Sequence, residues 1–173
     1  MTSLQKARDK ILSRREAARA VRAAQRRGER VVLTSGCFDL LHVGHLRSLE
    51  EARSYGDRLV VAINSDASVR RIKGRNRPII PMRQRAELLA ALQCVDWVMS
   101  FGGQTPRAVI GALAPDVYAK GGEWPLATLL AQDAPPDWKG EVKRLRRVPG
   151  VRTTAILERT LEKRGRSARR PSR

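Results

Sequence analysis

The two histidines of the chain, His42 and His45, are three residues apart and could bind one anion together. Side chains at this spacing lie on the same face of a helix. An imidazole donates a hydrogen bond when neutral and is a cation when protonated, so two of them suit a phosphate group. A structural pair or a zinc pair is the alternative, but for zinc neither Cys37 nor Cys94 stands at the spacing of a further ligand. The pair therefore predicts a phosphate-binding site.

The segment around these histidines is predicted to be a strand, a tight turn and a helix. Residues 31–34 (VVLT) form a short, β-branched apolar run, residues 35–37 (SGC) form a turn, and a helix opens near Leu40 and ends near Gly56. Backbone N–H groups and the helix dipole at such a helix N-terminus attract negative charge. We therefore expect a nucleoside triphosphate to bind here.

The rest of the chain alternates between predicted helices and strands, which indicates a single-domain α/β fold with a Rossmann-like, doubly wound parallel sheet. Residues 69–81 are predicted to be a loop after one short helical turn, and residues 125–140 to be irregular. Further strands are expected at 58–63, 95–101, 116–119 and 141–148, and further helices at 4–27, 82–92, 106–113 and 153–163. The polar residues that follow the strands should meet at one edge of the sheet, where ligands bind in such folds.

The positive charge of the chain is concentrated at its two ends. The formal net charge is +18; residues 1–30 carry ten Lys or Arg against three acids, and residues 163–173 carry six and no acid. We therefore distinguish a basic N-terminal helix (1–28), a central domain (29–162) and a basic disordered tail (163–173). Neither end contains aromatic residues that could stack on bases. Solvated ends are the favoured interpretation, and non-specific contacts with nucleic-acid phosphates are the alternative.

The cysteine content and the hydropathy favour a cytoplasmic protein without a membrane anchor. With 173 residues and 42% hydrophobic residues, the chain is long enough for a sizeable core. Two cysteines are too few for a disulfide framework, and no apolar run approaches the ~20 residues that span a bilayer. The N-terminus also lacks the apolar segment of a signal peptide.

Several blocks of the sequence resemble one family of enzymes. Residues 36–45, GCFDLLHVGH, are similar to the HxGH signature of the cytidylyltransferase-like nucleotidyltransferases, which have a Rossmann-like fold. Further blocks resemble the heptose 1-phosphate adenylyltransferase branch of that superfamily, which occurs alone or as the C-terminal half of a bifunctional heptose kinase. These blocks are residues 9–17, 57–66, 68–74, 77–81, 92–98, 115–124 and 153–159.

The resemblance implies an adenylyltransferase that transfers AMP from ATP to D-glycero-β-D-manno-heptose 1-phosphate, giving ADP-heptose and pyrophosphate. The sugar-phosphate oxygen would attack the α-phosphate directly and in line, so the protein would position two anions and neutralise developing charge. By this resemblance, His42 and His45 stabilise the transition state, and Lys73 clamps a phosphate as a third catalytic residue. Mg²⁺ is expected together with ATP, without a dedicated protein metal site. Homodimers are common among such relatives.

The resemblance also assigns residues to substrate binding. The turn after the first strand would surround the α-phosphate, the residues at 120–123 would approach the base or ribose, and the residues at 150–154 would hold the β,γ-phosphates. The assigned set is Ser35, Gly36, Cys37, Phe38, Asp39, Gly44, Asp66, Arg77, Arg85, Lys120, Gly121, Gly122, Glu123, Arg152, Thr153 and Thr154. Within it, Cys37 is interpreted as a small turn residue, because the reaction needs no nucleophile, and Asp39 as a helix cap or a loop anchor.

Three positions depart from the family pattern. Arg152 stands in place of the usual serine, Pro149 stands where an acid is common, and Glu123 replaces aspartate. Two other functions therefore stay open: a cytidylyltransferase acting on glycerol 3-phosphate or another small phosphorylated alcohol, and a nucleotide- or RNA-binding protein without catalysis. The choice of base and acceptor depends on the loops at 64–81 and 118–140.

Overall fold

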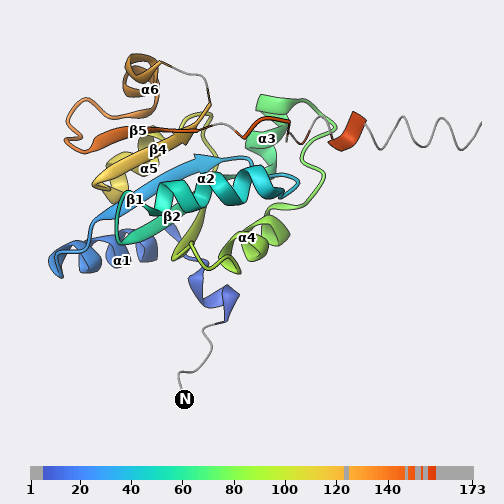
Figure 1. Cartoon of the computed structure of the whole chain (residues 1–173). Coiled ribbons are helices and arrows are strands. Elements are labelled where there is room, and N and C mark those ends of the chain that lie inside the picture. Colours follow the sequence, from blue (N-terminus) through green and yellow to red (C-terminus); the bar gives the residue numbers. More distant parts are fainter. Residues whose placement is uncertain (1–5, 123–124, 147, 151–152, 154–155, 159–173) are drawn as a thin grey trace, which may run out of the picture.

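The computed structural model describes residues 6–122, 125–146, 148–150, 153 and 156–158 of the 173. A five-stranded parallel sheet in the order β3-β2-β1-β4-β5 forms its centre, with helices on both faces (Figure 1). The predicted doubly wound α/β fold is confirmed. The elements are the 3-10 helix η1 (Ala7–Lys10), α1 (Arg14–Arg26), β1 (Val31–Gly36), α2 (Val43–Arg53), β2 (Arg58–Asn64), α3 (Asp66–Lys73), α4 (Met82–Ala90), β3 (Trp97–Phe101), α5 (Arg107–Leu113), β4 (Val117–Gly121), α6 (Leu126–Asp133) and β5 (Glu141–Leu145).

The central strands are buried on both faces, which explains their continuous apolar sequence. β1 and β2 pair in parallel, and residues 31–33 and 59–63 are fully buried. The strand order reverses direction at β1, since β2 and β3 lie on one side of it and β4 and β5 on the other. The crevice between the carboxyl ends of β1 and β4 is therefore a topological switch point, where α/β proteins bind their ligands.

The helices pack on the sheet in two apolar layers. α1 and α5 cover one face, where Ala17, Val21 and Ile110 are fully buried. α2 and α4 cover the other face through Leu49 and Leu89, and α2 is the helix that crosses the front of the sheet in Figure 1. Burial of a leucine, isoleucine or valine side chain stabilises a fold by roughly 1.5–3 kcal/mol. These two layers fix the positions of the carboxyl ends of the strands, where the candidate site lies.

The prediction of one continuous helix over residues 4–27 is wrong. Among the described residues, η1 ends before α1 begins, and Ser13 and Glu16 form a capping box at the start of α1 with hydrogen bonds of 2.8 and 3.3 Å. Between the two helices the chain runs along the edge strand β3, where the Leu12 N–H donates to the Val98 carbonyl at 2.8 Å. This contact covers the backbone of an edge strand.

Two segments are more helical than predicted, and both border the site. α3 covers residues 69–73 of the stretch 69–81, which was expected to be a loop after one short helical turn, and the Ser65 side chain caps this helix. α6 lies within the proline-containing stretch 125–140, where Pro125 stands before the first turn in an extended conformation. Leu129 and Asp133 of α6 are buried, so this helix is packed on the domain.

The predicted closing helix at 153–163 falls largely outside the described residues. Of that stretch, Thr153 and residues 156–158 are described, and they are helical. In the part of the chain that the structure describes, no helix has both the length and the apolar character to cross a membrane.

Candidate active site

A cavity of about 770 Å³ opens at the carboxyl ends of β1 and β4, at the switch point of the sheet. This volume lies in the range of small-molecule binding sites. The predicted site residues that line it are Ser35, Gly36, Cys37, Phe38, Asp39, His42, His45, Lys73, Arg77, Lys120, Gly121 and Thr153. Residues from distant parts of the sequence therefore meet in one cavity.

The two histidines stack against each other at the N-terminus of α2. Their ring centroids are 3.8 Å apart, with 16° between the ring planes. His42 is the N-cap of the helix, because its Nδ1 accepts a hydrogen bond from the backbone N–H of His45 at 3.3 Å. The helix consequently begins at Val43 rather than at the predicted Leu40. Both imidazoles thus lie at the positive end of a helix dipole.

Burial lowers the pKa of both histidines. The pKa of His45 falls to about 4, first because of burial and then because of the neighbouring His42, and the nearby Leu40 backbone partly opposes this shift. The pKa of His42 is lowered mainly by burial. Nδ1 of His45 is buried and has no hydrogen-bond partner among the described residues, which a bound water or ligand could explain. These shifts favour the neutral form of both rings, and a bound anion would favour their protonation.

The lowered pKa of His45 predicts a loss of stability in mild acid. Between about pH 4 and pH 6.5 the unfolded chain binds more protons at this residue than the folded chain, so the free energy of unfolding falls as the pH falls through this range. We expect urea unfolding to show that the free energy of unfolding falls by roughly 1–2 kcal/mol more in wild type than in a His45→Gln variant between pH 7 and pH 5. An equal decrease of the free energy of unfolding in the two proteins would contradict the lowered pKa of His45.

The turn between β1 and α2 is shaped by Gly36 and Phe38. A Cβ on Gly36 would lie 2.9 Å from the ring of Phe38. That ring lies 5.2 Å from the His45 ring, between centroids, at an angle of 59°. Phe38 has a left-handed backbone with φ 46°, a conformation that costs a non-glycine residue about 1–2 kcal/mol. The strained turn therefore places an aromatic ring against His45.

Asp39 anchors the loop before α4. Its buried carboxylate pairs with Nε of Arg77 at 2.5 Å and accepts the N–H groups of Ile79 and Ile80 at 2.8 and 2.9 Å. Of the two predicted roles, the loop anchor is confirmed and the helix cap is wrong, because His42 is the cap. Arg77 also lines the cavity, so its remaining N–H groups are the ones available to a phosphate.

Arg85 lies beneath the cavity wall. Its side chain is fully buried and donates to the backbone carbonyls of Cys37, Asn64 and Ile80, and Nη2 pairs with Oδ1 of Asp66 at 2.7 Å. The acceptors belong to the turn after β1, the end of β2, the loop before α4 and the start of α3. Arg85 therefore ties together the four segments around the site. Arg85 and Asp66, which were predicted to lie near the nucleotide or sugar, are each other's partners and do not line the cavity.

Five other predicted site residues do not lie in the cavity wall or cannot be placed. Gly44 is buried in the first turn of α2, and Gly122 follows β4 with φ 124°; neither lines the cavity. Glu123, Arg152 and Thr154 lie outside the described residues.

The cavity wall also contains polar residues that the motif-based assignment left out. Asn64 ends β2, Gln104 and Thr105 follow β3, and Gln132 and Asp133 come from α6. For the first three, the signal was their position after a predicted strand. The residues of α6 have no such signal, because the proline-flanked segment is predicted to be irregular.

The described residues do not form a protein cage for Mg²⁺. In the described part of the chain, no three His, Cys, Asp or Glu side chains are grouped so that they could hold a metal ion. The carboxylates in the cavity wall, Asp39 and Asp133, are paired with Arg77 and Lys120. Mg²⁺ usually binds through substrate phosphate oxygens and water with few protein ligands, so its prediction does not depend on such a cage.

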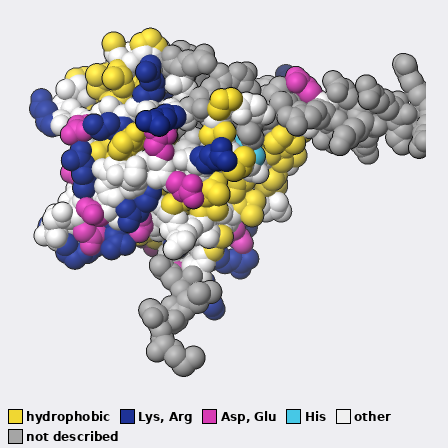
Figure 2. All heavy atoms as spheres, viewed as in Figure 1, with side chains coloured by type: hydrophobic (Ala, Val, Ile, Leu, Met, Phe, Trp, Pro, Cys, Tyr) yellow, Lys and Arg dark blue, Asp and Glu magenta, His cyan; other side chains and the backbone are white. Residues whose placement is uncertain are grey.

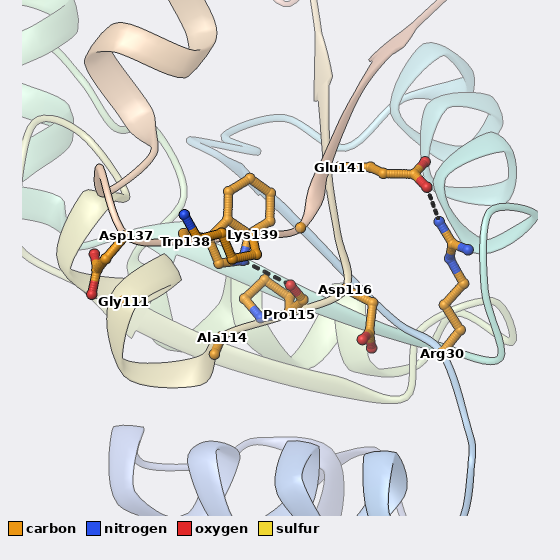
Figure 3. A pocket seen from close by; sticks show the side chains of 10 residues that line it. Arg30, Gly111, Ala114, Pro115, Asp116, Asp137, Trp138, Lys139 and Glu141 are labelled. Carbon is orange, nitrogen blue, oxygen red and sulfur yellow. Dashed lines mark hydrogen bonds and ion pairs between the residues drawn. The ribbon is translucent and has the colours of Figure 1, made fainter.

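A second cavity, of about 560 Å³, lies at the opposite edge of the sheet, before the amino ends of β1, β4 and β5 (Figure 3). Its side chains are largely paired with neighbouring groups: Arg30 binds Glu141 at 2.9 Å, and Nε1 of Trp138 donates to the Pro115 carbonyl at 2.8 Å. Ligands of open α/β sheets bind at the carboxyl ends of the strands. We therefore assign the chemistry to the cavity that contains the histidines.

The face of the molecule in Figure 2 mixes Lys and Arg side chains with Asp and Glu side chains. On the same face, histidine reaches the surface beside a band of hydrophobic side chains. The positive charge of the described residues does not form one continuous basic patch on this face, which agrees with the concentration of charge at the chain ends.

Comparison with known proteins gives similarities in sequence and fold. A protein-family model described as Cytidylyltransferase-like matches residues 33–168. The chain is similar to the bifunctional protein HldE of Alkalilimnicola ehrlichii, with 50% identity over 149 residues, which are 86% of this chain and 31% of that protein. The HldE protein of Chromohalobacter salexigens is 49% identical over 146 residues, with 84% and 31% of the two chains covered. The chain thus spans about a third of the length of these relatives.

One solved structure supports the fold. The chain is similar to the lipopolysaccharide core biosynthesis protein from Thermoplasma volcanium GSS1, with a TM-score of 0.58 and 27% sequence identity. The similarity covers 70% of this chain and 99% of that one.

Proposed function

The chain belongs to the cytidylyltransferase-like family, and from this membership we propose that it is a sugar-phosphate nucleotidyltransferase. The proposed reaction transfers AMP from ATP to D-glycero-β-D-manno-heptose 1-phosphate and releases ADP-heptose and pyrophosphate. The choice of heptose rests on the sequence blocks that resemble the heptose 1-phosphate adenylyltransferase branch. Similarity to part of longer, bifunctional relatives fits the occurrence of that branch as one half of a bifunctional protein.

The stacked pair of His42 and His45 is the observation that carries the proposal. The pair lies at a helix N-terminus in a cavity that Lys73, Arg77 and Lys120 also line. Imidazole N–H groups, ammonium and guanidinium groups are the donors that a triphosphate requires. The cavity opens at the switch point of the sheet, where this class of fold binds nucleotides.

In the proposed reaction, an oxygen of the sugar phosphate attacks the α-phosphorus, and the bond from that phosphorus to the bridging oxygen of the leaving pyrophosphate breaks. The negative charge that shifts toward the phosphoryl oxygens and pyrophosphate is stabilised by prearranged donors. His42 and His45 supply such donors, and Lys73 and Arg77 offset the charge of the triphosphate. No covalent intermediate is required, and burial raises the pKa of the Cys37 thiol, which disfavours a thiolate nucleophile.

Pyrophosphate release over a panel of substrates tests the proposal. ATP, CTP and GTP would each be paired with D-glycero-β-D-manno-heptose 1-phosphate, with glycerol 3-phosphate or with no acceptor. We expect the pair of ATP and heptose phosphate to give a kcat/KM at least about tenfold above every other pair. Release with CTP and glycerol 3-phosphate alone would contradict the proposed substrates. Binding of ATP without release for any pair would contradict catalysis and favour a nucleotide-binding protein.

A further inference from the structure

A chain of hydrogen bonds joins β1, β4 and α6 beneath one wall of the cavity. Oη of Tyr118 lies 2.9 Å from Oγ of Ser35 and donates to Oδ2 of Asp133 at 2.8 Å. Nζ of Lys120 lies 2.6 Å from the same carboxylate oxygen. Tyr118 is completely buried, whereas Ser35, Lys120 and Asp133 line the cavity. The buried phenol therefore connects two residues that a ligand can reach.

The number of available protons fixes the direction of these hydrogen bonds. A carboxylate that is paired with an ammonium group only accepts, so the single proton of Tyr118 points to Asp133. The Ser35 hydroxyl then has to donate to Tyr118, and it has no second proton. Ser35 consequently presents only lone pairs to the cavity. Burial and the Asp133 carboxylate raise the pKa of Tyr118, which keeps the phenol protonated.

Ser35 and the two histidines therefore differ in what they can bind. His42 and His45 can donate to phosphate oxygens, which have no proton of their own. Ser35 cannot, because its proton is used by Tyr118. The carboxylate of Asp133 also offsets the charge of Lys120 at 2.6 Å. The wall formed by Ser35, Lys120 and Asp133 is thus suited to a neutral group that can donate a hydrogen bond.

We propose that Ser35, oriented by Tyr118 and Asp133, recognises a hydroxyl group of a sugar substrate. A hydroxyl group both donates and accepts, so it can donate to Ser35 and accept from the Lys120 ammonium. Tyr118 and Asp133 act as positioning residues, because they set the direction of the Ser35 hydroxyl without touching the substrate in this role. The inference rests on the proposed function, which supplies two sugars: the ribose of ATP and the acceptor sugar.

A Tyr118→Phe variant tests this arrangement, with Tyr55→Phe as the matched control. Phenylalanine keeps the ring and removes the hydroxyl, so the Ser35 proton becomes free to turn toward the cavity. Tyr55, the other tyrosine of the chain, donates to Glu51 at 3.1 Å just after α2 and does not line the cavity. Calorimetric titration with ATP, 2′-deoxy-ATP and 3′-deoxy-ATP examines the ribose. Steady-state kinetics with heptose 1-phosphate and its singly deoxygenated analogues examines the acceptor.

We expect wild type and Tyr55→Phe to prefer the hydroxylated ligand about tenfold over one of these analogues. In Tyr118→Phe that preference should shrink to about twofold or less, with little change for the deoxy ligand, because the Ser35 hydroxyl is no longer held with its lone pairs toward the cavity and can turn its proton there instead. The analogue that shows the preference identifies the sugar. A Ser35→Ala variant should lose the same preference. Because Ser35 lies on the cavity surface, this variant tests the inference if Tyr118→Phe does not fold.

Two results would overturn the inference while leaving the proposed function intact. The first is turnover of ATP and sugar phosphate without a preference for any hydroxylated ligand in wild type. The second is an equal weakening of hydroxylated and deoxy ligands in both Tyr118→Phe and Ser35→Ala, which would mark the hydrogen-bond chain as structural support alone. A wild-type protein that neither binds nucleotides nor turns them over would instead overturn the proposed function together with the inference.

Discussion

Replacement of His45 by alanine is expected to lower the kcat of nucleotidyl transfer by about 10²- to 10³-fold, the effect of removing one preorganised donor to a developing anion. His45 stands in the first turn of α2, stacks on His42 at 3.8 Å and contacts the ring of Phe38. In the proposed reaction, its removal would delete an N–H donor from the helix end that would face the triphosphate. Steady-state pyrophosphate release at saturating sugar phosphate measures the loss.

Arg47→Ala on the same helix is the matched control for His45→Ala. Arg47 is exposed and does not line the cavity, so the kcat of the Arg47→Ala variant should stay within about threefold of the wild-type value. The loss in His45→Ala should fall on kcat more than on KM, because the donor acts on charge that develops in the transition state. A kcat within about fivefold of wild type would remove His45 from the catalytic assignment.

Replacement of Arg85 by methionine is expected to lower the free energy of unfolding by about 3–5 kcal/mol, because three backbone carbonyls around the site lose a side-chain donor. Methionine fills much of the volume, but it leaves the carbonyls of Cys37, Asn64 and Ile80 without their donor and Asp66 without its cation. Urea unfolding followed by circular dichroism measures the change. Since these acceptors surround the site, activity should fall together with stability.

Arg83→Met is the control for this prediction, because Arg83 lies on the same helix and is exposed. Its free energy of unfolding should stay within about 0.5 kcal/mol of wild type. If Arg85→Met were also within about 1 kcal/mol of wild type, the guanidinium would not hold the four segments together as its hydrogen bonds indicate.

The elements that carry the histidines could be predicted from the sequence because their signals are local. The apolar runs at 31–34 and 58–63 have no polar side to present to water, which is typical of strands in the middle of a parallel sheet. The turn after the first run contains Gly36, where a Cβ would lie 2.9 Å from the ring of Phe38 and would require that ring to shift. The helix start was placed too early, because a histidine N-cap is not among the usual capping residues.

The start of α1 and the presence of α6 were predicted wrongly although the sequence contains evidence for both. Ser13 and Glu16 have the spacing of a capping box, which marks the start of α1, yet a thin apolar stripe continues across this point. α6 was missed because Pro125 and Pro135 were interpreted as breakers. The segment between them is long enough for two turns, and a proline before the first turn is compatible with a helix.

The partners of the site residues depend on tertiary contacts that local sequence does not encode. The basic loop suggested that Arg77 is free for phosphate, but Asp39, which lies 38 positions away in the chain, pairs with it. Arg85 was expected near the nucleotide, but its donors are used by backbone carbonyls of other segments. The connection of Ser35 to Asp133 through Tyr118 likewise exists only once β1, β4 and α6 are packed together.

The fate of the α-phosphate of ATP tests the central claim most directly. ATP labelled at the α-phosphate would be incubated with D-glycero-β-D-manno-heptose 1-phosphate, and the label would be followed by chromatography together with released pyrophosphate. We predict that the label appears in the nucleotide sugar in equal amount to pyrophosphate, never on the protein, and that His45→Ala slows both. Label that remains in ATP, or that is found covalently on the protein, would contradict direct nucleotidyl transfer in this cavity.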